Sequence, residues 1–414
     1  MKKSLSLTQK ILLGMLLGLI AGIITHFFQD NVYVKLYLIN GFYHIGGKIF
    51  ISLMKMIVVP VVFVSLVCGT ASLTSPKTLG RMAGKTISLY ILTTAIAITI
   101  GLLLANITGI RIDMASVPVI NQINTKTPSI IETLINIIPS NPFEAFANGD
   151  MLPIILFSML FGIALALAGN AGKKITQIFN NVNDVIIQLI HMVINLTPYG
   201  VFCLIAKLIS ETGFQAISDL LGYFLVVIAS LLIHVILTNS ILLKFLARLN
   251  PLHFFKKMYS AMLFAFSTSS SNVSIPIVLE TVEEKLGVKN SIASFIIPLG
   301  ATINMDGTAI MQGVATVFIA HSYHIDLSLM NYAIIILTAI LASIGTAGIP
   351  SVGLIMLVMV LNQVGIPSEG IGYIIGIDRV LDMLRTAVNI TGDATVACVV
   401  ARSEKALDDE VFES

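Results

Sequence analysis

Long apolar runs separated by short polar connections occupy the first 250 residues of the chain. A helix that crosses the hydrocarbon of a membrane needs about 20 apolar residues. Runs of suitable length lie at about 9–28, 46–70, 86–108, 151–169, 181–206 and 219–246. The pattern therefore predicts six transmembrane helices within residues 1–250.

After residue 250 the pattern changes to interrupted apolar segments. Residues 258–279, "MYSAMLFAFSTSSSNVSIPIVL", place two short apolar arms around Ser, Thr and Asn, and residues 334–361 place two arms around "SIGTAGIPS". Each segment could be one ordinary span that carries a few polar residues. We favour re-entrant helical hairpins, because each arm is too short to cross and non-helical backbone is tolerated at membrane depth where it is buried in protein or lines a cavity.

A span with polar or charged residues follows each predicted hairpin. These spans are helix 7, at about 287–320, and helix 8, at about 367–404. Hairpin and span thus occur twice, and the two copies are expected to start from opposite sides of the membrane. This arrangement is typical of an inverted-topology repeat, which places a binding site at the membrane midplane between the halves.

Composition and charge support a membrane protein and exclude other classes. Hydrophobic residues make up 56% of the chain and charged residues 11%, whereas a soluble domain carries about 25% charged residues. The net charge of +2 does not favour nucleic-acid binding. Cys68, Cys203 and Cys398 are scattered through apolar runs, so neither a disulfide framework nor a metal cluster is expected.

Basic residues mark every second connection between the predicted spans. They are Lys2, Lys3 and Lys10 before the first span, then Lys77, Arg81, Lys85, Lys173, Lys174, Arg248, Lys256 and Lys257. Because cytoplasmic connections carry the excess of Lys and Arg, we expect both termini in the cytoplasm. The first span has no convincing cleavage site after it and is expected to be retained.

The last span carries a polar stripe. Its members are Asp378, Asp382, Arg385, Thr386, Asn389 and Asp393. At about 100° per residue they fall on one face of a helix, and charged residues within a span usually mark a substrate or ion pathway. The alternative is that Arg385 pairs with Asp382 or Asp378 to hold helices together, which leaves Asn389 and Asp393 unexplained.

The types of side chain suggest a ligand for this stripe. The planar guanidinium of Arg385 can hold a carboxylate through two hydrogen bonds, and Asp382 can hold an ammonium. Oxygen ligands, which Na⁺ prefers as a hard cation, are available from Asn304, Asp306 and Asp393. Gly307 is expected to permit a break that frees carbonyl groups. Few nitrogen or sulfur donors are near, so a transition-metal site is not expected.

Four motifs in order resemble one family. They are "STSSSNVSIP", "NMDGT", "SIGTAGIP" and "DMLRTAVNITGD". Together they resemble the glutamate transporter family, the dicarboxylate/amino acid:cation symporters, over nearly the whole chain. The resemblance implies an all-α polytopic membrane protein of the prokaryotic inner membrane. It also implies eight transmembrane helices plus two re-entrant hairpins, inverted repeats, an elevator-type mechanism and a homotrimer.

The resemblance also divides the chain into two parts. Residues 1–250 would form mainly the scaffold with the trimer contacts, although helices 3 and 6 would join the moving part. Residues 251–414 would form the transport core, with hairpin 1 at about 258–279 and hairpin 2 at about 334–361.

The resemblance further implies a substrate pocket. Arg385 would bind the side-chain carboxylate of the substrate and Asp382 its amino group. The other pocket residues would be Thr308, Thr386 and Asn389, with backbone groups near Ser270, Ser271, Gly348 and Ile349 closing the pocket.

Three cation sites are implied in the same way. The first would use Asp393 with carbonyl groups of Gly300, Asn304 and Asn389. The second would use carbonyl groups of Thr302, Met305, Ser343, Ile344 and Thr346. The third would use Tyr90, Thr93 and Thr94 with Asn304 and Asp306.

Within the family, single positions favour particular substrates. Asp382 favours an amino acid over a C4-dicarboxylate, and Arg385 favours an acidic over a neutral one. Asp393 and "INMDG" favour Na⁺ over proton coupling, while Gln312 argues against potassium counter-transport. We therefore expect Na⁺-coupled symport of L-aspartate or L-glutamate, with no enzymatic activity and no organic cofactor.

Several alternatives stay open or are disfavoured. Proton-coupled, C4-dicarboxylate and neutral amino acid symport are variants within the family. An ion channel would need a continuous polar path, which the two closing tips argue against. A membrane sensor is disfavoured, because it would normally carry a recognisable output domain. An intramembrane hydrolase is also disfavoured, because no His or Lys that could act as a base stands in a recognisable relation to "SSS" at 269–271.

A few residues depart from the family pattern or lack a role. Relatives usually carry a second arginine where Ser269 or Met383 stands here, which leaves Asp382 without its expected partner; Arg379 is a candidate substitute. Lys55 is expected to snorkel or to pair between helices rather than to contact substrate. The histidines assigned no chemical role are His26, His44, His191 and His234.

Overall fold

The computed structural model describes residues 7–72, 77–112, 138–213, 215–345, 348 and 350–413. Every regular element within these ranges is a helix, which confirms the all-α expectation. Two predicted site residues, Thr346 and Ile349, lie outside the described residues, as do Lys2 and Lys3 of the basic N-terminus.

The N-terminal part contains the long apolar helices. All the described helices of this part, in chain order, are α1 (Leu7–Phe27), η1 (Val34–Tyr43) with α2 (His44–Ser72), α3 (Lys77–Thr108), the short α5 (Pro142–Asn148), α6 (Met151–Leu167), α7 (Gly169–Ile194), α8 (Thr197–Thr212) and α9 (Gln215–Ile233), which continues as η2 (His234–Asn239) and η3 (Leu242–Ala247). Among the described residues, four helical stretches are long and apolar enough to cross a membrane, and α7 with α8 can form a fifth. Several membrane-length helices thus agree with a polytopic protein.

The predicted fifth span is not one straight helix. Its range of 181–206 covers the end of α7 and the first half of α8, and these two helices meet at a bend of 44°. Pro198 stands in the first turn of α8, where its missing N–H costs nothing, whereas inside a continuous helix it would remove a hydrogen bond. The sequence does not indicate this break, because residues on both sides of it are apolar.

The two interrupted segments fold as helix pairs. The first consists of α10 (Pro251–Thr268) and α11 (Ser271–Glu280), which continues as η4 (Thr281–Lys285); the second consists of α14 (Leu329–Gly345) and α15 (Val352–Gln363). Ser269 ends α10 in a left-handed conformation, with φ of 51°, and the chain reverses there before α11 begins. The first arm begins at Pro251 rather than near 258, because the Asn250 side chain caps it by accepting the Leu252 N–H at 2.9 Å.

The span after the first pair is broken, whereas the span after the second is continuous. The former consists of α12 (Asn290–Ile303) and α13 (Asp306–Ser322), and the latter of η5 (Ser368–Gly370) and α16 (Ile371–Ser403), followed by α17 (Asp409–Glu413). The break falls at Asn304 and Met305, which both have negative φ. The expectation that Gly307 permits the break is wrong. Gly307 lies inside α13, where a Cβ would come within 2.7 Å of the Arg385 carbonyl oxygen, so it allows α13 to approach α16.

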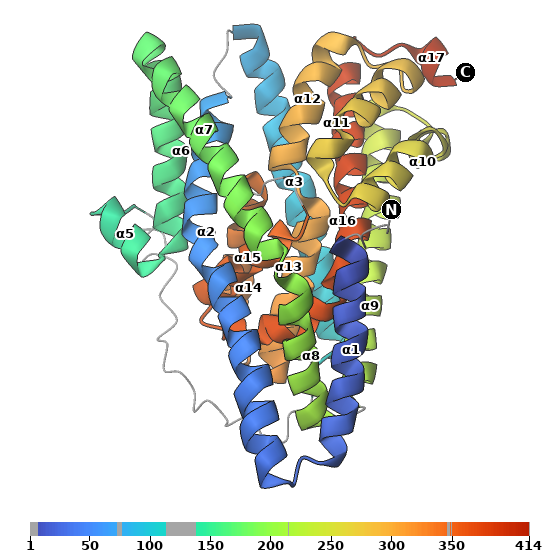
Figure 1. The fold of residues 1–414 in the computed structure, drawn as a ribbon. Helices are drawn as coiled ribbons and strands as arrows, with labels where there is room; N and C mark the ends of the chain where they lie inside the picture. The colour runs from blue at the N-terminus through green and yellow to red at the C-terminus, as the bar shows by residue number, and fades with distance from the viewer. Residues whose placement is uncertain are drawn as a thin grey trace, which may run out of the picture.

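Packing places α16 at the centre of the C-terminal part. It contacts α10, α12 and α13 and also α3 and α9 from the N-terminal part. In Figure 1, α1, α2 and α8 extend together toward the lower end, while α10, α11 and α17 gather at the opposite end. The helices from predicted spans 3 and 6 thus pack against the C-terminal helices, where the polar stripe lies.

Candidate substrate and cation site

The polar stripe of α16 lies in the interior of the protein. All six of its residues are buried, and the Arg385 side chain, the largest of them, is completely enclosed. An ionised group in such a place needs partners, because the loss of hydration is otherwise very costly. The geometry around Arg385 shows what these partners are.

Arg385 forms ion pairs with two aspartates of its own helix. Its Nη1 donates to Asp378 Oδ1 at 2.6 Å and its Nη2 to Asp382 Oδ1 at 2.9 Å. The pairing considered as an alternative on sequence grounds is therefore present, and Asp378 is the nearer partner. Arg385 Nε has no hydrogen-bond partner among the described residues. Because a guanidinium has five N–H donors, both ion pairs leave donors for a further carboxylate.

Asp382 has more partners than the sequence suggested. Its Oδ2 accepts the Ser351 N–H at 3.0 Å and lies 3.5 Å from Arg379 Nη1. Arg379 is buried, with 8% of its surface exposed, and residues three apart on a helix share a face. The expected arginine is absent from positions 269 and 383, and the candidate substitute, Arg379, does pair with Asp382. Two arginines and two aspartates balance in charge within this cluster.

The two helix pairs meet at their tips. The Gly348 carbonyl accepts hydrogen bonds from Ser270 Oγ at 2.7 Å and from the Asn272 N–H at 3.1 Å. A Cβ at Gly348 would lie 2.6 Å from Asn272 Oδ1 and 2.7 Å from the Ala301 carbonyl oxygen, so only glycine fits. Ser271, also buried, begins α11 beside this contact.

Helix α15 covers the remaining pocket residues. A Cβ at Gly353 would lie 3.0 Å from Thr308 Cγ2 and 3.6 Å from Arg385 Nη2, so α15 packs directly against both side chains. Thr386 is buried and donates to the Asp382 carbonyl at 2.8 Å. The structure therefore brings the predicted substrate residues together, apart from Ile349, which is not described.

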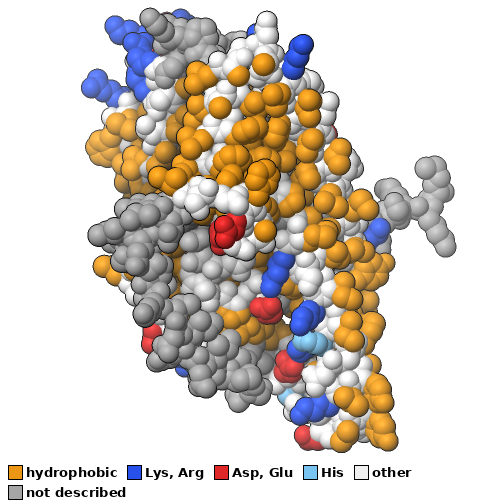
Figure 2. Space-filling view, turned by 90° about the vertical axis from the view of Figure 1, so that its left-hand side faces the viewer, with side chains coloured by type: hydrophobic (Ala, Val, Ile, Leu, Met, Phe, Trp, Pro, Cys, Tyr) orange, Lys and Arg blue, Asp and Glu red, His pale blue; other side chains and the backbone are white. Residues whose placement is uncertain are grey.

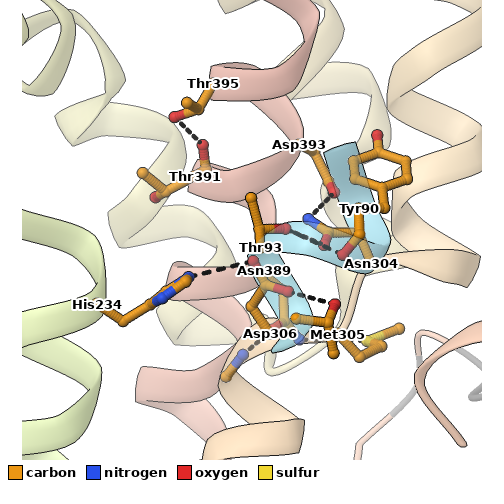
Figure 3. Close-up of polar contacts among 12 residues, drawn as sticks. Tyr90, Thr93, His234, Asn304, Met305, Asp306, Asn389, Thr391, Asp393 and Thr395 are labelled. Carbon is orange, nitrogen blue, oxygen red and sulfur yellow. Dashed lines mark hydrogen bonds and ion pairs between the residues drawn. The ribbon is translucent and has the colours of Figure 1, made fainter. Parts of the chain in front are cut away.

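Asn304, at the break between α12 and α13, connects the first predicted cation set (Figure 3). Its Nδ2 donates to Asp393 Oδ1 at 2.9 Å, while Asp393 Oδ2 is buried and has no hydrogen-bond partner among the described residues. A Cβ at Gly300 would lie 2.3 Å from Asp393 Oδ1 and 2.6 Å from the Tyr90 hydroxyl oxygen. Glycine thus lets the α12 backbone, the carboxylate and the tyrosine converge.

Residues of α3 complete the third predicted set. Thr93 Oγ1 donates to Asn304 Oδ1 at 3.5 Å, and Thr94 Oγ1 donates to Asp306 Oδ1 at 2.6 Å. Tyr90 donates its hydroxyl to the Ile296 carbonyl at 3.2 Å. The helix from predicted span 3 therefore reaches the break in predicted span 7.

The second predicted set surrounds the other side of the same break. Ser343 Oγ accepts the Met305 N–H at 2.8 Å and donates to the Ile303 carbonyl at 2.9 Å. Thr302 lies in the last turn of α12, and Ile344 follows Ser343 near the end of α14. The end of α14 is thereby held against the break, although Thr346 is not described.

Asn389 links the cation sets to the substrate stripe. Its Oδ1 accepts the Gly307 N–H at 2.8 Å, and its Nδ2 lies 3.2 Å from Met305 Sδ. It stands one turn beyond Arg385 and one turn before Asp393 on α16. Asn389 thus ties the break at Met305 to the helix that carries Arg385 and Asp393.

Sequence reasoning missed the role of His234. Its Nε2 lies 3.1 Å from Asp306 Oδ2, and the two side chains are 1% and 0% exposed (Figure 3). The only sign in the sequence was a histidine inside an apolar run, which by itself does not indicate a partner. Gln312 is also buried, and its amide has no hydrogen-bond partner among the described residues.

The donors around the break fit a hard cation. The carboxylate and amide oxygens of Asp306, Asn304 and Asp393 converge there with hydroxyl groups of α3. The unpartnered Asp393 Oδ2 is a buried carboxyl oxygen that a cation would satisfy. Na⁺ and similar ions prefer such oxygen donors. Asn304, Asp306 and Asp393 would therefore be the side-chain ligands.

Comparison with known proteins shows the family of this chain. The model of the sodium:dicarboxylate symporter family matches residues 7–403. The proton/sodium-glutamate symport protein of Bacillus caldotenax is 37% identical over 99% of this chain and 97% of the relative. The proton/glutamate-aspartate symporter of Escherichia coli K12 is 35% identical over 97% of this chain and 94% of the relative.

A third relative extends the range of substrates. The C4-dicarboxylate transport protein of Rhodospirillum rubrum is 36% identical over 87% of this chain and 83% of the relative. All three relatives are named as symporters or transport proteins. The chain therefore belongs to the sodium:dicarboxylate symporter family and is a membrane transporter, not an enzyme.

Proposed function

We propose that the protein couples Na⁺ to the uptake of an acidic amino acid, L-aspartate or L-glutamate. The observation that carries this proposal is the buried Arg385, held between Asp378 and Asp382 on the same helix as Asn389, which binds the Gly307 N–H, and Asp393, which binds Asn304. One set of side chains suits a zwitterion with an extra carboxylate, and the other suits a hard cation. Both sets meet on a single face of α16.

The charges of the substrate stripe favour an amino acid. A substrate carboxylate would take donors of Arg385, including Nε, which has no described partner. The substrate ammonium would take Asp382, whose two oxygens already lie beside Arg385 and Arg379. A C4-dicarboxylate has no ammonium, so it would leave Asp382 beside an added negative charge.

The cation donors favour Na⁺ as the coupling ion. The substrate-binding stripe and the break at Asn304 and Met305 share Asn389, so cation binding at the break would order the groups that hold the substrate. Such coupling requires only that the ion and the substrate bind best to the same conformation of the break and of the substrate-binding side chains. The family is named for sodium, and the Bacillus caldotenax relative is named for both proton and sodium.

Proton coupling is the second candidate. The Escherichia coli relative is named as a proton symporter, and a buried His–Asp contact lies at the proposed cation site. A buried carboxyl group without a partner can take up either a cation or a proton, so what favours Na⁺ at Asp393 is the family resemblance alone.

The transport core would move as a unit. Helices α10, α12, α13, α3 and α9 all contact α16, which is compatible with the moving part that the family resemblance implies, although α8 of the proposed scaffold contacts α16 as well. The remaining N-terminal helices would form the scaffold of a homotrimer in the cell inner membrane, with both termini in the cytoplasm.

Uptake into proteoliposomes tests the proposal. L-aspartate, L-glutamate, succinate and L-serine are compared under an inward Na⁺ gradient, an inward proton gradient, and neither. We expect the two acidic amino acids to accumulate only with the Na⁺ gradient. Accumulation driven by protons alone would favour the second candidate, and preference for succinate or serine would overturn the substrate assignment.

A further inference from the structure

A second polar cavity lies outside the buried site. It has a volume of about 290 Å³ and is bounded by α2, α8, the end of α13 and the start of α16. Figure 2 shows basic, acidic and histidine side chains close together in the lower half of a face that is otherwise mainly hydrophobic. The volume is close to the lower end, ~300 Å³, of pockets that bind small molecules.

One face of α2 supplies the basic wall of this cavity. His44, Lys48, Ser52 and Lys55 all line it. They are spaced by four, four and three residues, so they form a single stripe on the helix. The helix belongs to a stretch of membrane-spanning length, Val34–Cys68. Because charges on such a helix are costly and usually functional, the stripe needs an explanation.

Helix α8 and the opposite wall add further charges. Lys207 Nζ donates to His44 Nδ1 at 2.9 Å and lies 3.8 Å from Glu211 Oε1, while Lys55 Nζ lies 3.0 Å from Glu369 Oε1. Lys48 makes no ion pair with any residue that the structure describes. Three ammonium groups thus face two carboxylates around one cavity.

We propose that this cavity is a second, weaker binding site for a dicarboxylic amino acid, an inference that rests on the function proposed above. The two ligand carboxylates would take Lys48 and either Lys55 or Lys207, and the ligand ammonium would take Glu211 or Glu369. The Lys55 and Glu369 side chains are 37% and 60% exposed. Exposed pairs of this kind contribute little to stability, so a ligand can replace them at low cost.

The cavity and the buried site share one helix. Gly372 and Tyr373, near the start of α16, line the cavity. Asp378, the closest partner of Arg385, follows Tyr373 by five residues, roughly 7.5 Å along the helix at 1.5 Å per residue. A basic cavity at this distance would raise the local concentration of an anionic substrate beside the buried site.

The absence of tryptophan from the sequence allows a specific test. Tyr373→Trp places the only tryptophan of the chain at the cavity, where it can be excited apart from the tyrosines, and Arg385→Ala in the same chain removes the buried substrate site. L-aspartate is titrated in a Na⁺-free potassium buffer. We expect a saturable fluorescence change with a dissociation constant on the order of 1 mM. The absence of a saturable change, repeated with Tyr43→Trp on the α2 side, would overturn the proposal.

Matched variants and ligands sharpen the result. Lys48→Gln should weaken aspartate binding at least about tenfold, whereas Lys173→Gln, at an exposed lysine of α7, should leave it unchanged. Succinate should bind more weakly than aspartate, because it offers no ammonium to Glu211 or Glu369. Equal effects of the two lysine variants, or equal binding of aspartate, succinate and sulfate, would contradict a site for an amino acid.

The test is independent of transport. The Arg385→Ala chain is expected to carry no aspartate into proteoliposomes, yet to keep the fluorescence response. If the native chain fails to accumulate acidic amino acids, the proposed function fails. If the native chain accumulates them and the titration shows no binding, only the second site fails.

Discussion

His234 Nε2 lies 3.1 Å from Asp306 Oδ2, and this contact joins η2 to the first residue of α13 inside the protein. Thr94 donates to the other carboxylate oxygen at 2.6 Å. The two bonds together determine the orientation of the Asp306 carboxylate. We therefore expect His234 to act as a positioning residue for the proposed cation site rather than as an isolated core histidine.

Replacing His234 tests this role. His234→Ala should raise the Na⁺ concentration for half-maximal aspartate uptake by about tenfold, since loss of a residue that orients a metal ligand costs 10–100-fold in affinity. His234→Gln keeps an N–H donor on a side chain of similar reach and should restore much of the affinity. Na⁺ titrations of uptake and of direct aspartate binding measure both variants. A merely structural role would predict no rescue by glutamine.

Arg385 is expected to decide which substrates are carried. Arg385→Cys removes the partner for the side-chain carboxylate, so uptake of aspartate and glutamate should be abolished, while serine or another neutral amino acid gains entry. Uptake of each labelled amino acid under the same Na⁺ gradient measures the change. Aspartate uptake at the native rate would contradict the pocket assignment.

Arg379 is expected to support Asp382. Arg379→Gln leaves the cluster of Asp378, Asp382 and Arg385 with a net negative charge, which opposes an acidic substrate. The aspartate concentration for half-maximal uptake should rise roughly tenfold, equivalent to about 1.4 kcal/mol.

A second variant keeps this prediction specific. Met383→Arg, added to Arg379→Gln, places an arginine at a position where the family resemblance implies one and should recover much of the affinity. If Arg379→Gln left the half-maximal aspartate concentration unchanged, and Met383→Arg did not lower it, Arg379 would not act through Asp382.

Asp393 is expected to control the response to Na⁺. Asp393→Asn removes the only charge of its cation set, so half-maximal uptake should require at least about tenfold more Na⁺. Asp409→Asn is the matched control, because Asp409 is 62% exposed and pairs with Arg402 at the end of α16. If both variants kept the native Na⁺ titration, the first cation site would be wrong.

Much of the architecture could be predicted from the sequence, because its signals are local. Apolar length indicated the long helices, and the serine- and glycine-rich interruptions indicated the two helix pairs. The spacing of six polar residues placed them on one face of α16. These predictions depend on helical period and hydrophobicity, which can be read from neighbouring residues in the sequence without the fold. The four motifs likewise indicated the family before any contact was known.

Only the tertiary structure decided which groups meet. The contact between His234 and Asp306 joins residues 72 positions apart, and no local pattern relates them. The partner of Asp382 depended on how the arginines of α16 point, and the break at Asn304 and Met305 depended on hydrogen bonds from α14 and α16. The charged wall of the second cavity also arises where α2 packs beside α8 and the start of α16. Such contacts follow from packing between distant helices, which a linear pattern of polar and apolar residues does not encode.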